Sequence, residues 1–266
     1  MAKASLSKTV KTLSHLSPRF VSVTHGADGG AQNQTIKALD TLRIENPTLG
    51  LAGHLTCRAG SKGETIAAAQ DYEATGARWV VALRGDAEGG AGEAFEPIAH
   101  GFQSTPDLIA GLREKTGLRI AVGAYPEVHP DSPSEAADTE HLKRKVDAGA
   151  DTIITQYFFE NDDFYRFVDR CRAAGIDVPI IPGIMPITNF GKIAQFSERC
   201  GAKIPARLVD RFEKAEARGV SRDLALAVCA GQCDDLREQG VRAFHFYTLN
   251  RADLTLGVCQ ALGVDP

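Results

Sequence analysis

Short apolar runs alternate with helical patterns along the chain. Seven runs are rich in Val, Ile, Leu and aromatic residues, and they span 20–24, 51–55, 79–83, 120–124, 152–155, 178–181 and 243–247. Strands that are apolar at nearly every position are typical of parallel sheets covered by helices on both faces. The helical patterns between them include 64–75, 138–148, 164–174 and 221–239. This alternation predicts an α/β protein with a parallel sheet.

Glycines mark four of the passages from helix to strand. A helical pattern ends in a small or polar residue followed by Gly76, Gly149, Gly175 or Gly240, and an apolar run begins soon after each glycine. Glycine after the last helical turn adopts the left-handed conformation that ends a helix. We interpret the four sites as repeats of one α-to-β unit.

The two ends of the chain define the predicted fold. Apolar residues at Leu6, Val10, Leu13 and Leu16 have helical spacing before the first strand, and another helix is expected over 252–262. A closed barrel is the commonest parallel α/β solution near this length, but it begins with a strand. We therefore predict a (β/α)8 TIM barrel in which strand 1 is absent and seven strands are present, as a single catalytic domain over 1–266, N-terminally incomplete.

Composition narrows the possible partners and the location. With 266 residues, 43% of them hydrophobic, the chain can bury a sizeable core, and its net charge of -4 gives no basic surplus for nucleic acid. Six cysteines without a C-x-x-C pair indicate reduced thiols, with no metal site and no disulfide scaffold. No apolar stretch is long enough for a membrane span or a secretory signal. We expect a cytoplasmic protein that acts on small molecules.

Candidate functional residues follow the carboxyl ends of the predicted strands. Barrel enzymes carry their sites on the loops at the carboxyl ends of the strands. Nearly every strand ends in a polar or aromatic group. The ends read Thr24-His25-Gly26, His54-Leu55-Thr56, Arg84-Gly85-Asp86, Tyr125-Pro126-Glu127-Val128-His129, Gln156-Tyr157-Phe158-Phe159, Pro182-Gly183-Ile184 and Tyr247-Thr248-Leu249-Asn250-Arg251. The opposite ends are mostly glycine turns, so the asymmetry favours an enzyme.

Six blocks resemble the successive signature segments of methylenetetrahydrofolate reductases, in the family's order. They are 20–24, 54–57, 82–86, 124–130, 143–150 and 245–251. The resemblance runs from about Arg19 to the C-terminus, and the chain ends where the bacterial form ends. It implies FAD held by barrel loops, NADH or NADPH as reductant, and reduction of 5,10-methylenetetrahydrofolate to 5-methyltetrahydrofolate in one-carbon and methionine metabolism. It also implies a homo-oligomer. No G-x-G-x-x-G follows a strand, so the usual dinucleotide fingerprint is absent.

The resemblance assigns roles to individual residues. Those expected to bind FAD are Thr24, His54, Arg84, Gly85, Asp86, Tyr125, His129, Asp138, Arg144 and Lys145. Asp86 is also the expected catalytic residue, where it would stabilise a cationic form of the folate. Without the resemblance, Asp86 reads as a helix-capping carboxylate or a partner of Arg84, His54 as a structural histidine, and residues 143–145 as a solvated helix face.

The resemblance likewise implies a folate site. Gln156 would hydrogen-bond the pterin ring, because a side-chain amide both donates and accepts. Phe196 would stack on extended substrates, and Arg251 would contact the folate. At the position where the family has a second glutamine that contacts the folate, this chain has Lys192, so it departs from the family pattern there. Gln156 also reads as a core amide, and Phe196 as core packing, since it has helical spacing to Ile193.

One feature of the family has no counterpart in the sequence. The first strand of these reductases carries the glutamate that acts as general acid in opening the folate ring, and no such block occurs here. Its loss is expected to slow ring opening by about 10²- to 10⁴-fold. A misassigned start, a truncation and an inactive paralogue are competing explanations. The alternative function is therefore a catalytically impaired flavin-binding barrel. A Schiff-base aldolase fits less well, because Lys143 and Lys145 precede a strand.

Overall fold

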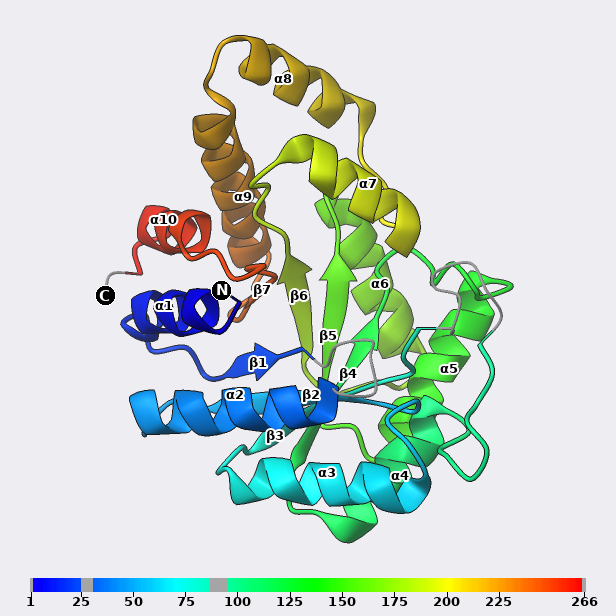
Figure 1. Ribbon diagram of the computed structural model, residues 1–266. Helices are drawn as coiled ribbons and strands as arrows, with labels where there is room; N and C mark the ends of the chain where they lie inside the picture. The colour runs from blue at the N-terminus through cyan, green and yellow to red at the C-terminus, as the bar shows by residue number, and fades with distance from the viewer. Residues whose placement is uncertain (1, 25–30, 87–94, 265–266) are drawn as a thin grey trace. The chain divides into compact units, whose positions relative to one another are not determined.

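The computed structural model describes residues 2–24, 31–86 and 95–264 (Figure 1). The first helix precedes the first strand, and helices alternate with strands as predicted as far as β6, after which three helices follow in succession before the last strand. Within the described ranges the elements are α1 (Ala2–Ser14), β1 (Val21–Val23), α2 (Ala31–Glu45), β2 (Leu51–Thr56), α3 (Lys62–Ala74), β3 (Trp79–Leu83), α4 (Thr105–Lys115), β4 (Arg119–Ala124), α5 (Glu135–Asp147), β5 (Thr152–Tyr157), α6 (Asn161–Ala173), β6 (Ile180–Ile184), α7 (Phe190–Cys200), α8 (Ala206–Ala217), α9 (Ser221–Glu238), β7 (His245–Phe246) and α10 (Asp253–Ala261).

The strands form one sheet in chain order, from β1 to β7. The pairs β1–β2, β2–β3, β3–β4 and β6–β7 are parallel; for example, Val21 lies opposite Leu51 and Gly183 lies opposite His245. Seven parallel strands with helical connections confirm the predicted α/β class. They are consistent with a (β/α)8 barrel in which one strand is missing.

Two compact units make up the chain. Unit 1 consists of residues 1–123 and 140–153, and unit 2 consists of residues 124–139 and 154–266.

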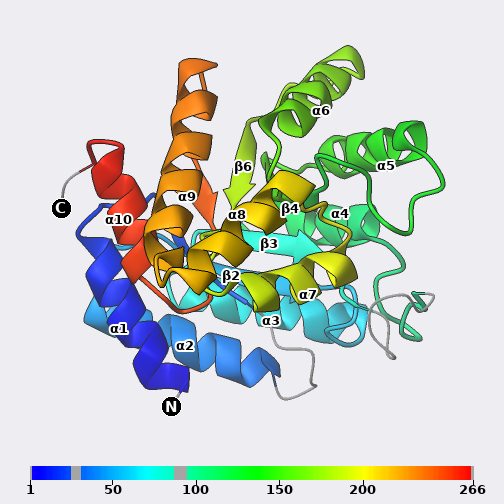
Figure 2. The same cartoon turned by 90° about the horizontal axis from the view of Figure 1, so that it is seen from above.

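Unit 1 contains β1 to β3, β4 except for Ala124, the helices α1 to α4 and the larger part of α5. Its core strands are apolar on both faces, and Leu51, Leu55, Val80 and Ile120 are fully buried. The helix α1 packs on α2, and α3 packs beside α4 (Figures 1 and 2). Helix α3 starts with a capping box, in which Ser61 and Glu64 each bond the other's backbone N–H. The strands of unit 1 are therefore held by a well-packed core, which fixes the positions of the residues at their ends.

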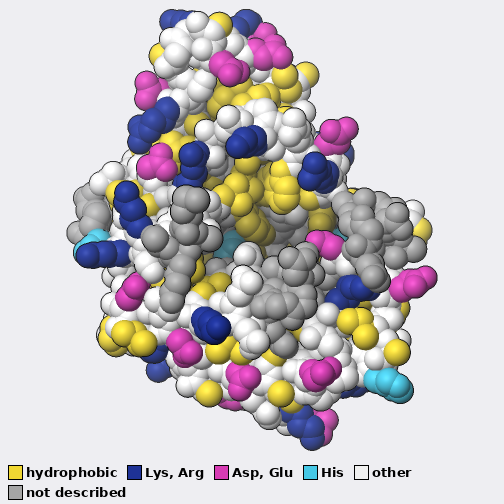
Figure 3. All heavy atoms as spheres, in the orientation of Figure 1, with side chains coloured by type: hydrophobic (Ala, Val, Ile, Leu, Met, Phe, Trp, Pro, Cys, Tyr) yellow, Lys and Arg dark blue, Asp and Glu magenta, His cyan; other side chains and the backbone are white. Residues whose placement is uncertain are grey.

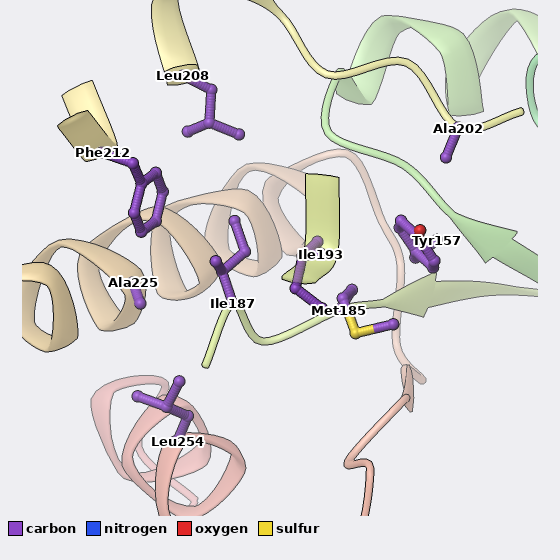
Figure 4. Close-up of a cluster of buried hydrophobic side chains, with 9 residues drawn as sticks. All are labelled: Tyr157, Met185, Ile187, Ile193, Ala202, Leu208, Phe212, Ala225 and Leu254. Atoms are coloured by element: carbon purple, nitrogen blue, oxygen red, sulfur yellow. The ribbon is translucent and has the colours of Figure 1, made fainter. Parts of the chain in front are cut away.

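Unit 2 contains β6, β7, most of β5 and the helices α6 to α10. Helix α9 packs against α6, α8 and α10. On the face drawn in Figure 3, hydrophobic side chains gather over the ends of β5 and β6, below α7. A buried cluster joins these elements and includes Tyr157, Met185, Ile193, Phe212 and Leu254 (Figure 4). A second cluster, around Phe158, Cys233 and Leu236, joins α6, α9 and β6.

Three details differ from the sequence-based expectations. The strand predicted over 178–181 is β6 at Ile180–Ile184, so Pro182 and Gly183 lie inside a strand and not in the following loop. Gly183 fits there because its N–H donates to Thr155 Oγ1 at 2.9 Å and a Cβ would lie 2.1 Å from the Thr155 carbonyl oxygen. The strand predicted over 243–247 is only His245–Phe246, since Ala243 is exposed. Helices α7 and α8 were not among the predicted patterns.

No helix in the described ranges is long and apolar enough to cross a membrane. All six cysteines are free thiols.

Candidate active site

Gly85 shapes the segment after β3. Its φ of +88° lies in the region that favours glycine, and a Cβ at this position would meet the Thr56 Cβ at 3.1 Å. Arg84, half-buried, places its guanidinium 5.1 Å from the centre of the Phe95 ring and donates from Nε to the Gly85 carbonyl at 3.4 Å. Asp86 follows as an exposed carboxylate. The turn therefore presents a cation and an anion at the carboxyl end of one strand.

His54 lies within β2, with its backbone fixed from the side of α3. The Tyr72 hydroxyl donates to the His54 carbonyl at 3.0 Å. Burial raises the pKa of Tyr72 to about 12, so this hydroxyl remains a donor at neutral pH. Gly53 permits the contact, because a Cβ there would lie 2.5 Å from the Tyr72 ring. The half-buried imidazole of His54 is thus carried by a rigid strand.

Thr24 and the two cations of α5 complete the predicted residues of unit 1. Thr24 is exposed just after β1, and its carbonyl accepts the Thr35 hydroxyl at 3.4 Å. His25 and Gly26 lie outside the described residues. Lys145 donates from Nζ to the carbonyl of Gly123 in β4 at 3.0 Å, so it faces a strand end. The exposed Arg144 contacts His141 at 3.4 Å, on the solvent side of α5.

In unit 2, three predicted FAD ligands lie together. The rings of Tyr125 and His129 meet edge to face, with centroids 4.6 Å apart. The backbone N–H of His129 donates to Asp138 Oδ2 at 3.1 Å. The N–H of Asp131 donates to His129 Nδ1 at 3.1 Å, so a neutral ring carries its proton on Nε2. The sequence prediction that these three residues share a site is consistent with this arrangement.

Two residues that the sequence analysis did not select hold the same loop. Glu127 is buried, which raises the pKa of its carboxyl, and its Oε1 accepts the Lys203 N–H at 2.9 Å. Arg170 of α6 donates to the carbonyls of Pro126 and Glu127, at 3.1 and 3.4 Å, and bridges to Glu135 at 3.0 Å. Glu127 stood inside a predicted motif, whereas nothing in the sequence marked Arg170.

The predicted substrate residues Gln156, Lys192 and Phe196 lie on β5 and α7. Gln156 accepts the Tyr157 N–H through Oε1 at 3.1 Å. Lys192 is exposed in the first turn of α7, where its N–H donates to the Asn189 cap at 2.9 Å. Phe196 is 45% exposed, which contradicts the reading of this residue as core packing, and its ring stacks on that of Tyr157 at 6.0 Å.

Arg251 follows an unusual turn. Leu249 and Asn250 have φ values of +50° and +58°, and the Arg251 N–H donates to the Thr248 carbonyl at 2.8 Å. Positive φ is uncommon for residues other than glycine, and for leucine it costs free energy. The turn leaves the Arg251 side chain exposed after β7.

The predicted residues thus form groups inside each unit. Arg84, Gly85 and Asp86 lie in unit 1, and Tyr125, His129, Asp138, Gln156 and Phe196 lie in unit 2. That all of them serve one ligand stays a prediction.

Parallel strands that alternate with helices and end in polar side chains define an α/β enzyme of the barrel type. A profile of the methylenetetrahydrofolate reductase family matches residues 1–263. The chain is 42% identical to 5,10-methylenetetrahydrofolate reductase of Salmonella typhimurium and 41% identical to that of Escherichia coli, in both cases over 97% of this chain and 85% of the relative. A probable methylenetetrahydrofolate reductase (NADH) of Oryza sativa is 35% identical over 93% of this chain and 43% of its own length. The protein belongs to the methylenetetrahydrofolate reductase family and is an oxidoreductase.

Proposed function

We propose that this protein reduces 5,10-methylenetetrahydrofolate to 5-methyltetrahydrofolate with bound FAD, using NADH or NADPH as reductant. Membership of the family supports the reaction. The observation that carries the choice of FAD is the arrangement of Tyr125, His129 and Asp138. It combines an aromatic ring, an imidazole with its proton on Nε2, and a carboxylate that fixes the loop.

The residues of the site suit the chemistry of a flavin dinucleotide. Arg84, Arg144 and Lys145 supply cations for a diphosphate, and charge-assisted hydrogen bonds of this kind are the strong ones. Lys145 uses one of its three donors on the Gly123 carbonyl and keeps two for a ligand. Tyr125 and His129 offer aromatic surface and a donor. When bound, FAD would carry hydride from the nicotinamide to the folate, which no protein side chain can do.

Asp86 and Gln156 would act on the folate. An exposed carboxylate at the strand end stabilises positive charge that develops on the methylene carbon and its nitrogen, as preorganised charges do in enzymes. The Gln156 amide would donate to and accept from the pterin edge, with its Oε1 oriented by the Tyr157 N–H. Phe196 would cover one face of the substrate ring. Gln156 and Phe196 would thus bind and orient the folate, and Asp86 would stabilise its positive charge.

A second candidate function is flavin binding and reduction without turnover of folate. It is supported by the grouping of Tyr125, His129 and Asp138, which lie together within unit 2 and would hold a flavin without any folate residue. Transfer of hydride from the nicotinamide to the flavin needs no general acid. This protein would then be reduced by NADH and would stay reduced in the presence of the folate.

Visible absorbance of the flavin distinguishes these functions. The purified full chain is incubated with FAD, freed of excess, and mixed anaerobically with NADH and then with methylenetetrahydrofolate. We expect a yellow protein that NADH bleaches and the folate restores. Bleaching without restoration supports the second candidate. A colourless protein that retains no FAD refutes both.

A further inference from the structure

We propose that Tyr157 is a positioning residue for substrate binding: its hydroxyl ties α7 to β5 and thereby holds the ring of Phe196 in place to stack on the substrate. This inference rests on the proposed function, since it needs Phe196 to contact the substrate. We refer to Tyr157, Ser197 and Cys200 as the α7 latch.

The latch joins two elements through one buried hydroxyl group. Tyr157 ends β5 and is fully buried, and its Oη lies 2.8 Å from Ser197 Oγ and 3.2 Å from Cys200 Sγ. Ser197 is buried too, with 1% exposure. A phenol in apolar surroundings needs a hydrogen-bond partner, and leaving a buried hydroxyl unpaired is costly. The position of α7 along β5 is thus set by a directional contact and not by packing alone.

The Tyr157 ring is fixed from the other side as well. Phe159 and Tyr247 contact it edge to face, at centroid distances of 5.6 and 6.1 Å. Tyr247 is itself held, because its hydroxyl donates to the Thr155 carbonyl at 2.8 Å. Figure 4 shows Tyr157 at one edge of the buried cluster, near Ala202 and Met185. The ring is therefore a rigid base for whatever lies on it.

Phe196 lies on this base. The two rings are nearly parallel, with 22° between their planes and 6.0 Å between centroids, although Phe196 remains 45% exposed. An exposed phenylalanine supported on one face by a buried ring can stack a planar ligand, such as a pterin, on the other. Ser197 follows Phe196 directly in α7, so the hydrogen bond at Ser197 restrains the backbone that carries the exposed ring. The latch thus acts on the substrate through Phe196.

The test removes only the hydroxyl group. Tyr157→Phe keeps the ring and its stacking but loses both contacts to α7. We expect the KM for methylenetetrahydrofolate to rise about fivefold, with kcat within about twofold of wild type and FAD affinity unchanged. Ser197→Ala, which leaves the contact to Cys200, gives a rise no larger than this, and adding it to Tyr157→Phe gives no further increase, because the bond to Ser197 is already lost in Tyr157→Phe.

The matched control is Tyr165→Phe. This change also removes one tyrosine hydroxyl, whose solvent-exposed hydrogen bond runs to Asp235 at 2.7 Å, but Tyr165 lies on α6 and is not a member of the latch. Its KM should equal that of wild type. Phe196→Leu should raise the KM about tenfold, and adding Tyr157→Phe to it should have no further effect, since Tyr157 acts through Phe196.

Three results would overturn the latch. One is an unchanged KM in Tyr157→Phe while Phe196→Leu is impaired. Another is an unchanged KM in Phe196→Leu. The third is a full fivefold increment from Tyr157→Phe on the Phe196→Leu background. In each case an active wild type leaves the proposed function intact. A wild type that forms no methyltetrahydrofolate refutes the proposed function, and the latch with it.

Discussion

His245, in β7, shows how one partly buried side chain makes stability depend on pH. Burial lowers the pKa of its imidazole to about 4, against an ordinary value of 6.5. Between these values the unfolded chain binds a proton that the native protein does not. The contribution of neutral His245 is therefore fully present above pH 6.5 and is lost as the pH falls toward 4.

We predict that this residue accounts for about 2 kcal/mol of the stability lost between pH 7 and pH 5. Urea unfolding of wild type and His245→Gln at the two pH values measures the difference. The variant should be less stable at pH 7 but should lose less on acidification. Equal losses in the two proteins would show that His245 does not titrate in this way.

At Gly85, backbone geometry determines which side chain the protein can accept. We predict that Gly85→Ala destabilises the protein by about 1–2 kcal/mol, because alanine is strained at a φ of +88° and its Cβ would press on Thr56. FAD should also bind more weakly, since Arg84 and Asp86 flank the turn. The control is Gly63→Ala in α3, where a Cβ meets nothing within 4 Å and helix propensity favours alanine. A Gly85 variant as stable as wild type contradicts the prediction.

For single residues, sequence motifs predicted functional positions, but they did not predict contacts between residues that are far apart in the chain. Gly85 and Asp86 were predicted from the strand end they follow. Tyr157 was not selected, because its hydroxyl partner Ser197 lies 40 residues away and neither residue type signals the pairing. For Phe196, helical spacing indicated core packing and the family resemblance indicated substrate stacking, and the 45% exposure of its side chain argues against core packing.

Among the elements, α6 supports the loop that carries Tyr125 and His129. Arg170 reaches from α6 to two carbonyls of this loop, and its Nε is buried without a hydrogen-bond partner among the described residues. These two bonds from α6 add to the bonds that the loop makes itself, so the neighbouring helix contributes to the shape of the loop.

We predict that Arg170→Leu weakens FAD binding about tenfold, because two loop carbonyls lose their donors. Quenching of flavin fluorescence measures the affinity. Arg166→Ala is the control on the same helix, since the Arg166 side chain is 62% exposed and pairs with Asp163 of the same helix. It should bind FAD as wild type does. Equal affinity in the two variants would contradict a role for α6 in holding the loop.

Apolar runs predicted the positions of most strands well. Proline and glycine, which usually end a strand, gave wrong bounds where the packing of the protein keeps them inside one. The strands β2, β3 and β4 lie within a residue of their predicted bounds, because each is largely buried and mostly apolar. The end of β6 was missed since Pro182 and Gly183 read as breakers. Helices α7 and α8 were missed because they lie between β6 and α9 with no strand before the next helix, outside the strict alternation of one strand with one helix.

For the whole molecule, the repeat of strand and helix was sufficient to predict the α/β class, and six signature blocks were sufficient to predict the family. Both are confirmed, by the parallel order from β1 to β7 and by the family match over residues 1–263. The division into two compact units was not predicted, because strand-helix repeats look alike on either side of the boundary near Gly123. Long-range packing, and not local pattern, sets that boundary.

The central claim is that this chain transfers hydride from a nicotinamide to methylenetetrahydrofolate by way of FAD. The most direct measurement is an anaerobic single turnover, in which the FAD-loaded protein is reduced with one equivalent of NADH, mixed with the folate, quenched and assayed for 5-methyltetrahydrofolate by chromatography. We predict about one product molecule for each flavin reduced. Complete reduction of the flavin with no methyltetrahydrofolate formed would contradict the claim.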